Sequence, residues 1–179
     1  MTGFLRGRDK HERAAFQLYG AAVAAAREPF LYETLGVPDT LDGRFDAIVL
    51  HVYLVVQRLN TEPEPGPALA QAVFDAMFLD MDINLREMGV GDLSVGKRNR
   101  AMWEAFHGRS AAYATAWDDA SALSPAIARN VWRGAEAPAG SAAALGRLAH
   151  AQAAYLTAQD LQVMLRGEMR FLPAEEAVR

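Results

Sequence analysis

The run Gly91–Arg98, with the sequence GDLSVGKR, comes closest to a chemical motif in this chain of 179 residues. It nearly matches the phosphate-binding loop G-x-x-x-x-G-K-[ST], whose backbone amides cradle phosphates and whose final hydroxyl binds magnesium. Arg98 stands where that hydroxyl should be. The preceding segment is predicted to be helical, whereas a phosphate-binding loop follows a strand. We therefore interpret the run as a turn between two helices and predict no nucleotide site.

Metal ligands and nucleophiles are also sparse. The histidines are scattered, at His11, His51, His107 and His150. They form neither H-E-x-x-H nor the E-x-x-H pairing of di-iron bundles. Asp75, Asp80 and Asp82 suggest a metal cluster, but residues two apart on a helix point to different sides. The chain has no cysteine and no serine in a nucleophile elbow. We predict no catalytic residue, metal or cofactor, and hence no enzyme.

Arg109 is the charged residue whose position most needs an explanation. It shares an apolar helical face with Phe106 and Tyr113. A buried charge without a partner costs on the order of several kcal/mol, so Arg109 should pair with a carboxylate or open onto a cleft. Asp75 and Asp82, on the preceding long helix, are the expected partners. Two interpretations stay open: a structural ion pair, and a charged cleft that receives a partner peptide.

The elements that position these residues are predicted to be helices almost throughout. Between residues 40 and 60 apolar side chains recur at alternating steps of four and three, which is typical of a helix buried in a bundle. We find no convincing strand pattern. The sequence predicts one all-α domain over residues 1–179, a bundle of roughly six helices without significant β-sheet, and a mobile tail over residues 173–179. The expected helices span residues 9–27, 30–35, 40–60, 68–88, 95–117, 124–133 and, capped by Ser141, 141–166.

Composition narrows the class of partner. Hydrophobic residues make up 51% of the chain and the formal net charge is -4, without a long basic block, so we expect no direct recognition of nucleic acid. The apolar run Ala47–Val56 is far shorter than the roughly 20 residues of a transmembrane helix. Residues 1–13 lack a signal-peptide core. We expect a soluble cytoplasmic protein, and leave open a peripheral position on the inner face of the cytoplasmic membrane.

One turn sequence occurs twice. Gly36–Arg44 and Gly89–Lys97 both read G-V-x-D-x-x-x-G-[RK]. In each, we expect the first glycine to stop a helix, the aspartate to cap the next, and the later glycine to let another backbone approach. If the two turns lie together, they could form one end of a binding surface.

Three stretches together resemble the ubiquinol–cytochrome c chaperone family: LGVPDTLDGRF at residues 35–45, FDAMFLDMDINLREMGVGDLSVGK at 74–97 and FHGRSAAY at 106–113. The resemblance covers about residues 16–117. The helices expected within residues 121–166 are less characteristic of the family. It implies a helical assembly chaperone that binds newly made cytochrome b during biogenesis of ubiquinol–cytochrome c reductase, without a cofactor. Mitochondrial members also work with a small partner protein and the ribosome, so a ribosome or membrane surface is a further expected partner.

The alternative is a helical lipid- or quinone-binding protein with a pocket beside the apolar helix 40–60. For the chaperone, Met77, Met81 and Met88 either fill the core or provide an adaptable wall. The predicted partner-binding residues are Tyr32, Asp39, Arg44, Asp75, Asp82, Arg86, Asp92, Lys97, Arg109 and Tyr113.

Overall fold

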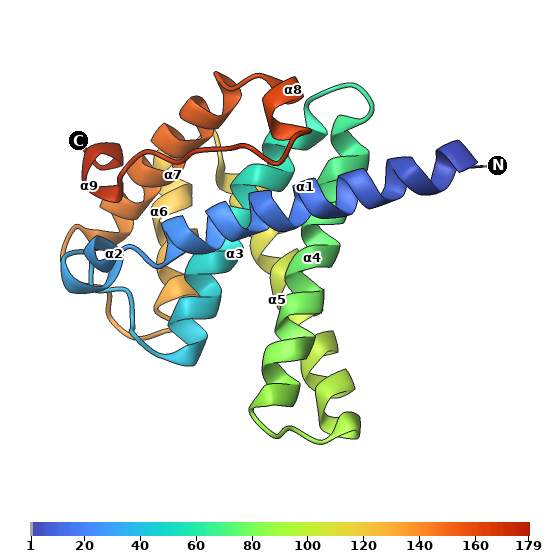
Figure 1. The fold of residues 1–179 in the computed structure, drawn as a ribbon. Coiled ribbons are helices and arrows are strands. Elements are labelled where there is room, and N and C mark those ends of the chain that lie inside the picture. The colour runs from blue at the N-terminus through green and yellow to red at the C-terminus, as the bar shows by residue number, and fades with distance from the viewer. Residues whose placement is uncertain (1) are drawn as a thin grey trace.

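Helices account for all the regular structure in the part of the chain that the structure describes. This computed structural model describes the backbone of residues 2–179 and the side chains of residues 11–179. The all-α prediction is confirmed, and six of the helices have twelve or more residues (Figure 1). None of the described helices is long and apolar enough to cross a membrane. In chain order they are α1 (Thr2–Ala26), α2 (Pro29–Glu33), α3 (Leu41–Asn60), α4 (Gly66–Glu87), α5 (Asp92–Ala116), α6 (Ala120–Val131), α7 (Ser141–Thr157), α8 (Leu161–Met164) and α9 (Ala174–Ala177).

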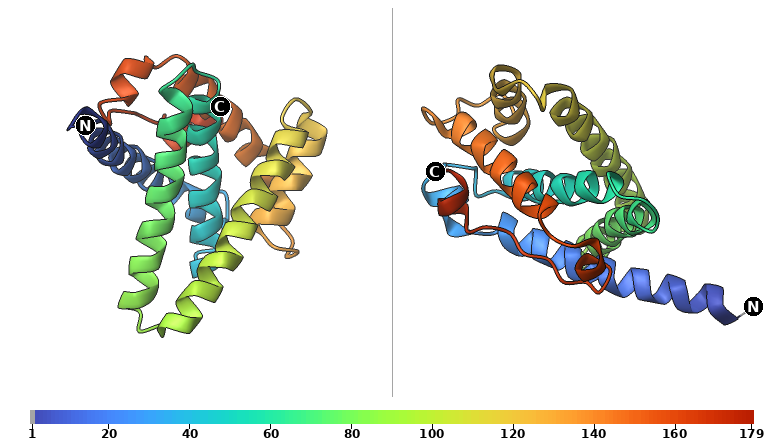
Figure 2. Two further views of the ribbon diagram at one scale, coloured as in Figure 1. Left: turned by 90° about the vertical axis from the view of Figure 1, so that its right-hand side faces the viewer. Right: turned by 90° about the horizontal axis from the view of Figure 1, so that it is seen from above.

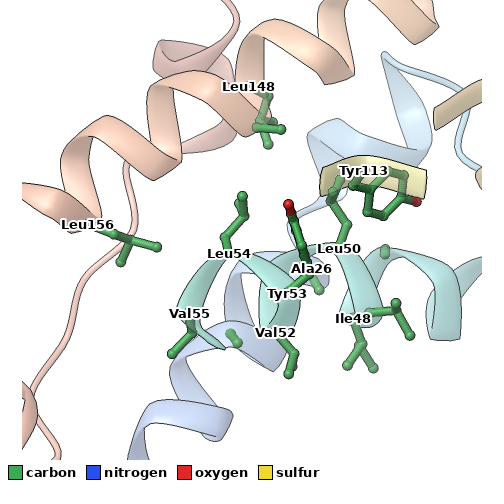
Figure 3. Close-up of a cluster of buried hydrophobic side chains, with 14 of the residues drawn as sticks. Ala26, Ile48, Leu50, Val52, Tyr53, Leu54, Val55, Tyr113, Leu148 and Leu156 are labelled. Atoms are coloured by element: carbon green, nitrogen blue, oxygen red, sulfur yellow. The ribbon is translucent and has the colours of Figure 1, made fainter. Parts of the chain in front are cut away.

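Helix α3 is the centre of the domain. It contacts α1, α4, α5, α6 and α7, and every residue from Phe45 to Val55 is buried. In Figure 3, Leu50 and Leu54 point towards α7, whereas Ile48 and Val52 point to the opposite side. This packing explains the pattern in the sequence, because a helix surrounded by neighbours needs apolar residues around most of its circumference.

Local signals set most helix ends. Thr40 caps α3, its Oγ1 accepting a hydrogen bond from the backbone N–H of Gly43 at 3.1 Å. Gly36 and Gly89 adopt positive φ angles of 68° and 78° after α2 and α4, as a helix-stopping glycine does. Helix α6 starts earlier than expected, since Asp119 caps it and Pro125 lies inside it.

The C-terminal region differs from the prediction. The expected helix 141–166 ends at Thr157, and the chain then turns through α8 and runs back in an extended segment. Ser141 does not cap α7, because Gly140 occupies the cap position with φ 79°. The tail after Pro173 forms α9, which packs on α7 with Ala174 and Ala177 buried. Contacts between segments so far apart in the chain leave no local sequence pattern. From the sequence alone the tail was therefore predicted to be mobile.

Candidate functional site

A largely apolar hollow lies between α3, α4 and α5. The α4–α5 hairpin extends beyond the start of α3 (Figures 1 and 2). The hollow has a volume of about 480 Å³ and is open to solvent. We call this hollow the groove. Its lining residues are Arg27, Leu41, Asp42, Arg44, Phe45, Ile48, Asp80, Met81, Asn84, Leu85, Met88, Arg98, Ala101, Met102, Ala105, Arg109 and Arg133.

Flexible apolar side chains form much of the groove wall. Met81 and Met88 come from α4 and Met102 from α5. Met88 and Leu41 are 54% and 68% exposed at the rim, so apolar surface there is open to a partner. Methionine adapts its shape to irregular apolar partners. Met77, by contrast, is fully buried and fills the core, whereas Met81 and Met88 line the groove and are available as an adaptable wall.

A buried carboxylate holds one end of the groove together. Asp46 on α3 has no exposed surface, and its Oδ1 lies 2.7 Å from Nη2 of Arg109 on α5. Its Oδ2 accepts a hydrogen bond from Nε of Arg133 at 2.7 Å, in the loop after α6. Arg133 also pairs with Asp42 at 2.8 Å. Burial raises the pKa of the Asp46 carboxyl, while the two guanidinium groups oppose that rise. Asp46 thereby ties α5 and the α6–α7 loop to α3.

The predicted partners of Arg109 are therefore wrong. Asp75 is exposed and accepts a hydrogen bond from Gln71 Nε2 at 2.8 Å. Asp82 binds Arg86 Nε at 2.6 Å. The sequence carried a signal for the true partner: Asp46 is the only acidic residue between Phe45 and Val55 of α3. A lone carboxylate in a buried apolar run must find a cation.

Three predicted residues stabilise the α4–α5 turn. Arg86 pairs with Asp82 of its own helix and with Asp92 at the start of α5. Asn99 of α5 donates a hydrogen bond from Nδ2 to Asp82 Oδ1 at 2.7 Å. These pairs join the two helices at the tip of the hairpin, and none of the four residues lines the groove.

Tyr32, Asp39 and Arg44 lie together around a second hollow of about 460 Å³. Arg44 Nε donates to Asp39 Oδ1 at 2.6 Å, and the Tyr32 hydroxyl donates to the carbonyl of Ala26 at 2.7 Å. Arg27 and Arg44 line both this hollow and the groove. The two hollows thus adjoin along one side of the molecule.

Two further predicted residues, Lys97 and Tyr113, lie outside the groove. Lys97 is exposed on α5 and does not line the groove. Tyr113 has no exposed surface and packs against Tyr53, with ring centroids 5.5 Å apart, so it belongs to the core. Of the ten predicted residues, Arg44 and Arg109 line the groove.

The repeated turns differ in packing. A methyl group on Gly43 would lie 2.0 Å from the carbonyl oxygen of Pro38, so this glycine does allow a close backbone approach. A methyl group on Gly96 would meet nothing within 4 Å. The aspartates do not cap as expected, since Asp39 pairs with Arg44 and Asp92 with Arg86. The two turns therefore share their sequence pattern but only part of their structure.

Two candidates from the sequence remain, a metal cluster and the run Gly91–Arg98. Among residues 11–179, no three His, Asp or Glu side chains lie close enough together to hold a metal ion. The run Gly91–Arg98 follows α4 and forms the first turns of α5, in a helical context unlike that of a phosphate-binding loop.

Three comparisons with known proteins agree with one another. A family described as ubiquinol-cytochrome C chaperone matches residues 33–171, so the match extends past Trp117, where the resemblance noted in the sequence ended. Ubiquinol-cytochrome-c reductase complex assembly factor 1 of Xenopus laevis is 26% identical over 94 residues, which are 52% of this chain and 47% of that protein. The chain thus spans about half the length of this relative. The crystal structure of the Cbp3 homolog from Brucella abortus superposes with a TM-score of 0.83 at 33% identity, covering 97% of this chain and 96% of that one.

Proposed function

This chain belongs to the ubiquinol-cytochrome C chaperone family, and from that premise we propose that its groove binds newly made cytochrome b while ubiquinol–cytochrome c reductase is assembled. The family is one of chaperones, not of enzymes. We place the protein in the cytoplasm at the inner face of the membrane, where cytochrome b is inserted.

The groove is the observation that carries this proposal. An apolar helix of a membrane protein needs cover before it is packed, and a groove between helices can receive one face of it. Met81, Met88 and Met102 suit a sequence-tolerant apolar contact. Exposed charges among the lining residues, such as Arg98, keep the rim of the groove hydrated.

Filling the groove tests the proposal. Ala101 lines the groove and is exposed, so Ala101→Trp adds bulk inside it without entering the core. Ala111, exposed on the same helix, does not line the groove, and Ala111→Trp adds the same bulk elsewhere. In a strain lacking this gene, we expect Ala111→Trp to restore cytochrome b and Ala101→Trp to leave it depleted while its messenger persists. Full rescue by both variants would reject the groove as the binding surface.

A direct measurement complements the rescue. A photoreactive amino acid at position 101 should crosslink to cytochrome b in membranes that are synthesising it, and the same group at position 111 should not. If neither position crosslinks and the deletion strain keeps normal reductase levels, the assembly role itself is wrong.

The groove also favours a second candidate, a lipid- or quinone-binding protein. Its volume of about 480 Å³ lies in the range of small-molecule sites, and Ile48 of α3 contributes to its wall. Native mass spectrometry of the purified protein distinguishes the two functions. A bound lipid or quinone that Ala101→Trp displaces, without an effect on cytochrome b, would favour this candidate.

A further inference from the structure

We propose that the groove selects a client helix that carries acidic side chains beside its apolar face, and that Arg27 and Arg98 receive those acids. The inference rests on the proposed function, since it specifies what kind of helix the groove accepts. Five arginines line the groove, against the two aspartates Asp42 and Asp80.

Three of the five arginines are neutralised within the protein. Arg109 and Arg133 share the buried carboxylate of Asp46, and Arg133 also binds Asp42. Arg44 pairs with Asp39 at 2.6 Å. These cations have their counter-charge already, so they add little attraction for an acidic ligand.

Arg27 and Arg98 differ from the other three. Both are exposed, and neither forms an ion pair with any of the side chains described, residues 11–179. Arg27 follows the last residue of α1 and Arg98 lies in the second turn of α5, so the two reach the groove from different elements. Among the described side chains, Asp80 is the one lining acid outside an ion pair, and it accepts a hydrogen bond from the Tyr19 hydroxyl at 2.7 Å. The free charge of these lining residues is therefore positive.

This arrangement matches one kind of occupant. A purely apolar helix would use the methionine wall and leave both guanidinium groups without partners. A helix with lysine or arginine beside its apolar face would place like charges together, which disfavours binding. Glutamate or aspartate at those positions pairs with both arginines while the apolar face lies on Met81 and Met102. Charge complementarity thus selects the acidic helix.

Three synthetic helical peptides test this inference. They share one apolar face and differ only in the residues beside it, which are Glu, Gln or Lys. Their dissociation constants are measured by fluorescence anisotropy at 20 and 300 mM NaCl. We expect the Glu peptide to bind about tenfold more tightly than the Gln peptide at low salt and the Lys peptide to bind most weakly. The difference should shrink at high salt, because exposed charges are screened.

Two double variants locate the effect. Arg27→Gln with Arg98→Gln should abolish the preference for the Glu peptide and keep the affinity for the Gln peptide. Arg13→Gln with Arg129→Gln removes the same net charge from exposed residues that lie outside the groove and, like Arg27 and Arg98, form no ion pair with the side chains described, so it should keep the preference. All four arginines are exposed, and circular dichroism checks that both variants fold.

The outcomes separate this inference from the proposed function. Equal binding of the three peptides, or equal loss of preference in both double variants, overturns the inference, and crosslinking of position 101 to cytochrome b then decides the proposed function independently. Absence of peptide binding also overturns it. If the protein instead binds phosphatidylglycerol vesicles, with dependence on Arg27 and Arg98, the groove receives lipid and the inference is wrong.

Discussion

Asp46 on α3 and Arg109 on α5 form an ion pair of 2.7 Å between a carboxylate without exposed surface and a guanidinium that is 12% exposed. Arg109 also stands over the ring of Phe45, with its Cζ 5.8 Å from the ring centroid. The pair thus joins the core of the domain to the wall of the groove. It makes the shape of the groove depend on a residue that no partner can touch.

Replacing Asp46 should destabilise the fold strongly. Asp46→Asn leaves two guanidinium groups without their buried counter-charge, and removing one member of a buried ion pair costs about 3–5 kcal/mol. We expect a lower urea midpoint in equilibrium unfolding. The control is Asp39→Asn, whose partner Arg44 is 59% exposed, and which should change the midpoint much less. Similar midpoints for the two variants would contradict the structural role of Asp46.

Alanine at the two equivalent glycines of the repeated turn should have opposite effects. Gly43→Ala places a methyl group 2.0 Å from the Pro38 carbonyl oxygen, and such overpacking costs about 1–3 kcal/mol. Gly96→Ala meets open space in a helix interior, where alanine is favoured over glycine by up to about 1 kcal/mol. Thermal unfolding should therefore show a lower midpoint for the first variant and a slightly higher midpoint for the second. A shift of both midpoints in the same direction would refute the difference in packing.

His51 should make the fold sensitive to acid. Burial lowers the pKa of His51 to about 4, while its Nδ1–H donates to the Ala47 carbonyl at 2.8 Å. In the unfolded chain the histidine binds a proton below about pH 6.5, so the unfolded state gains stability as the pH falls from there towards 4. The free energy of unfolding should drop by about 3 kcal/mol across that window through this group.

The variant His51→Gln isolates the contribution of His51. Its free energy of unfolding, measured in urea between pH 4 and 7, should lack the part of the slope that His51 supplies. The raised pKa of Asp46 acts in the opposite direction in acid, and it is common to both proteins, so it cancels in the comparison. Identical slopes in the two proteins would show that His51 titrates normally.

Gln152 should hold the C-terminal segment in place. It is 1% exposed on α7; its Nε2 donates to the Leu172 carbonyl at 2.7 Å, and its Oε1 accepts from the Leu172 N–H at 2.9 Å. Gln152→Ala removes both bonds and should cost about 1–3 kcal/mol. Hydrogen exchange should become faster over residues 170–178. Gln71→Ala, which removes an exposed bond to Asp75, serves as the control and should leave that exchange unchanged.

The helices themselves were predictable because their signals are local. The apolar repeat of α3, the Thr40 cap and the positive-φ glycines at 36 and 89 act within a few residues, and each appears in the structure near its expected place. The break after Thr157 was not predictable in this way. Gln152 and Gln159 hold the returning chain by hydrogen bonds to Leu172 and Arg170, and contacts over such separations leave no periodic pattern.

The sequence alone determined that this is a helical domain, that Arg109 lies on an apolar face and that it needs a counter-charge. Only the tertiary structure decided that Asp46 supplies that charge, that Tyr113 is in the core, and that Arg27 and Arg98 find no ion-pair partner at the groove among the side chains of residues 11–179. The physical reason is the range of each interaction. Helix formation follows residues three and four apart, whereas the choice of an ion-pair partner depends on distances between elements that only the packed fold brings together.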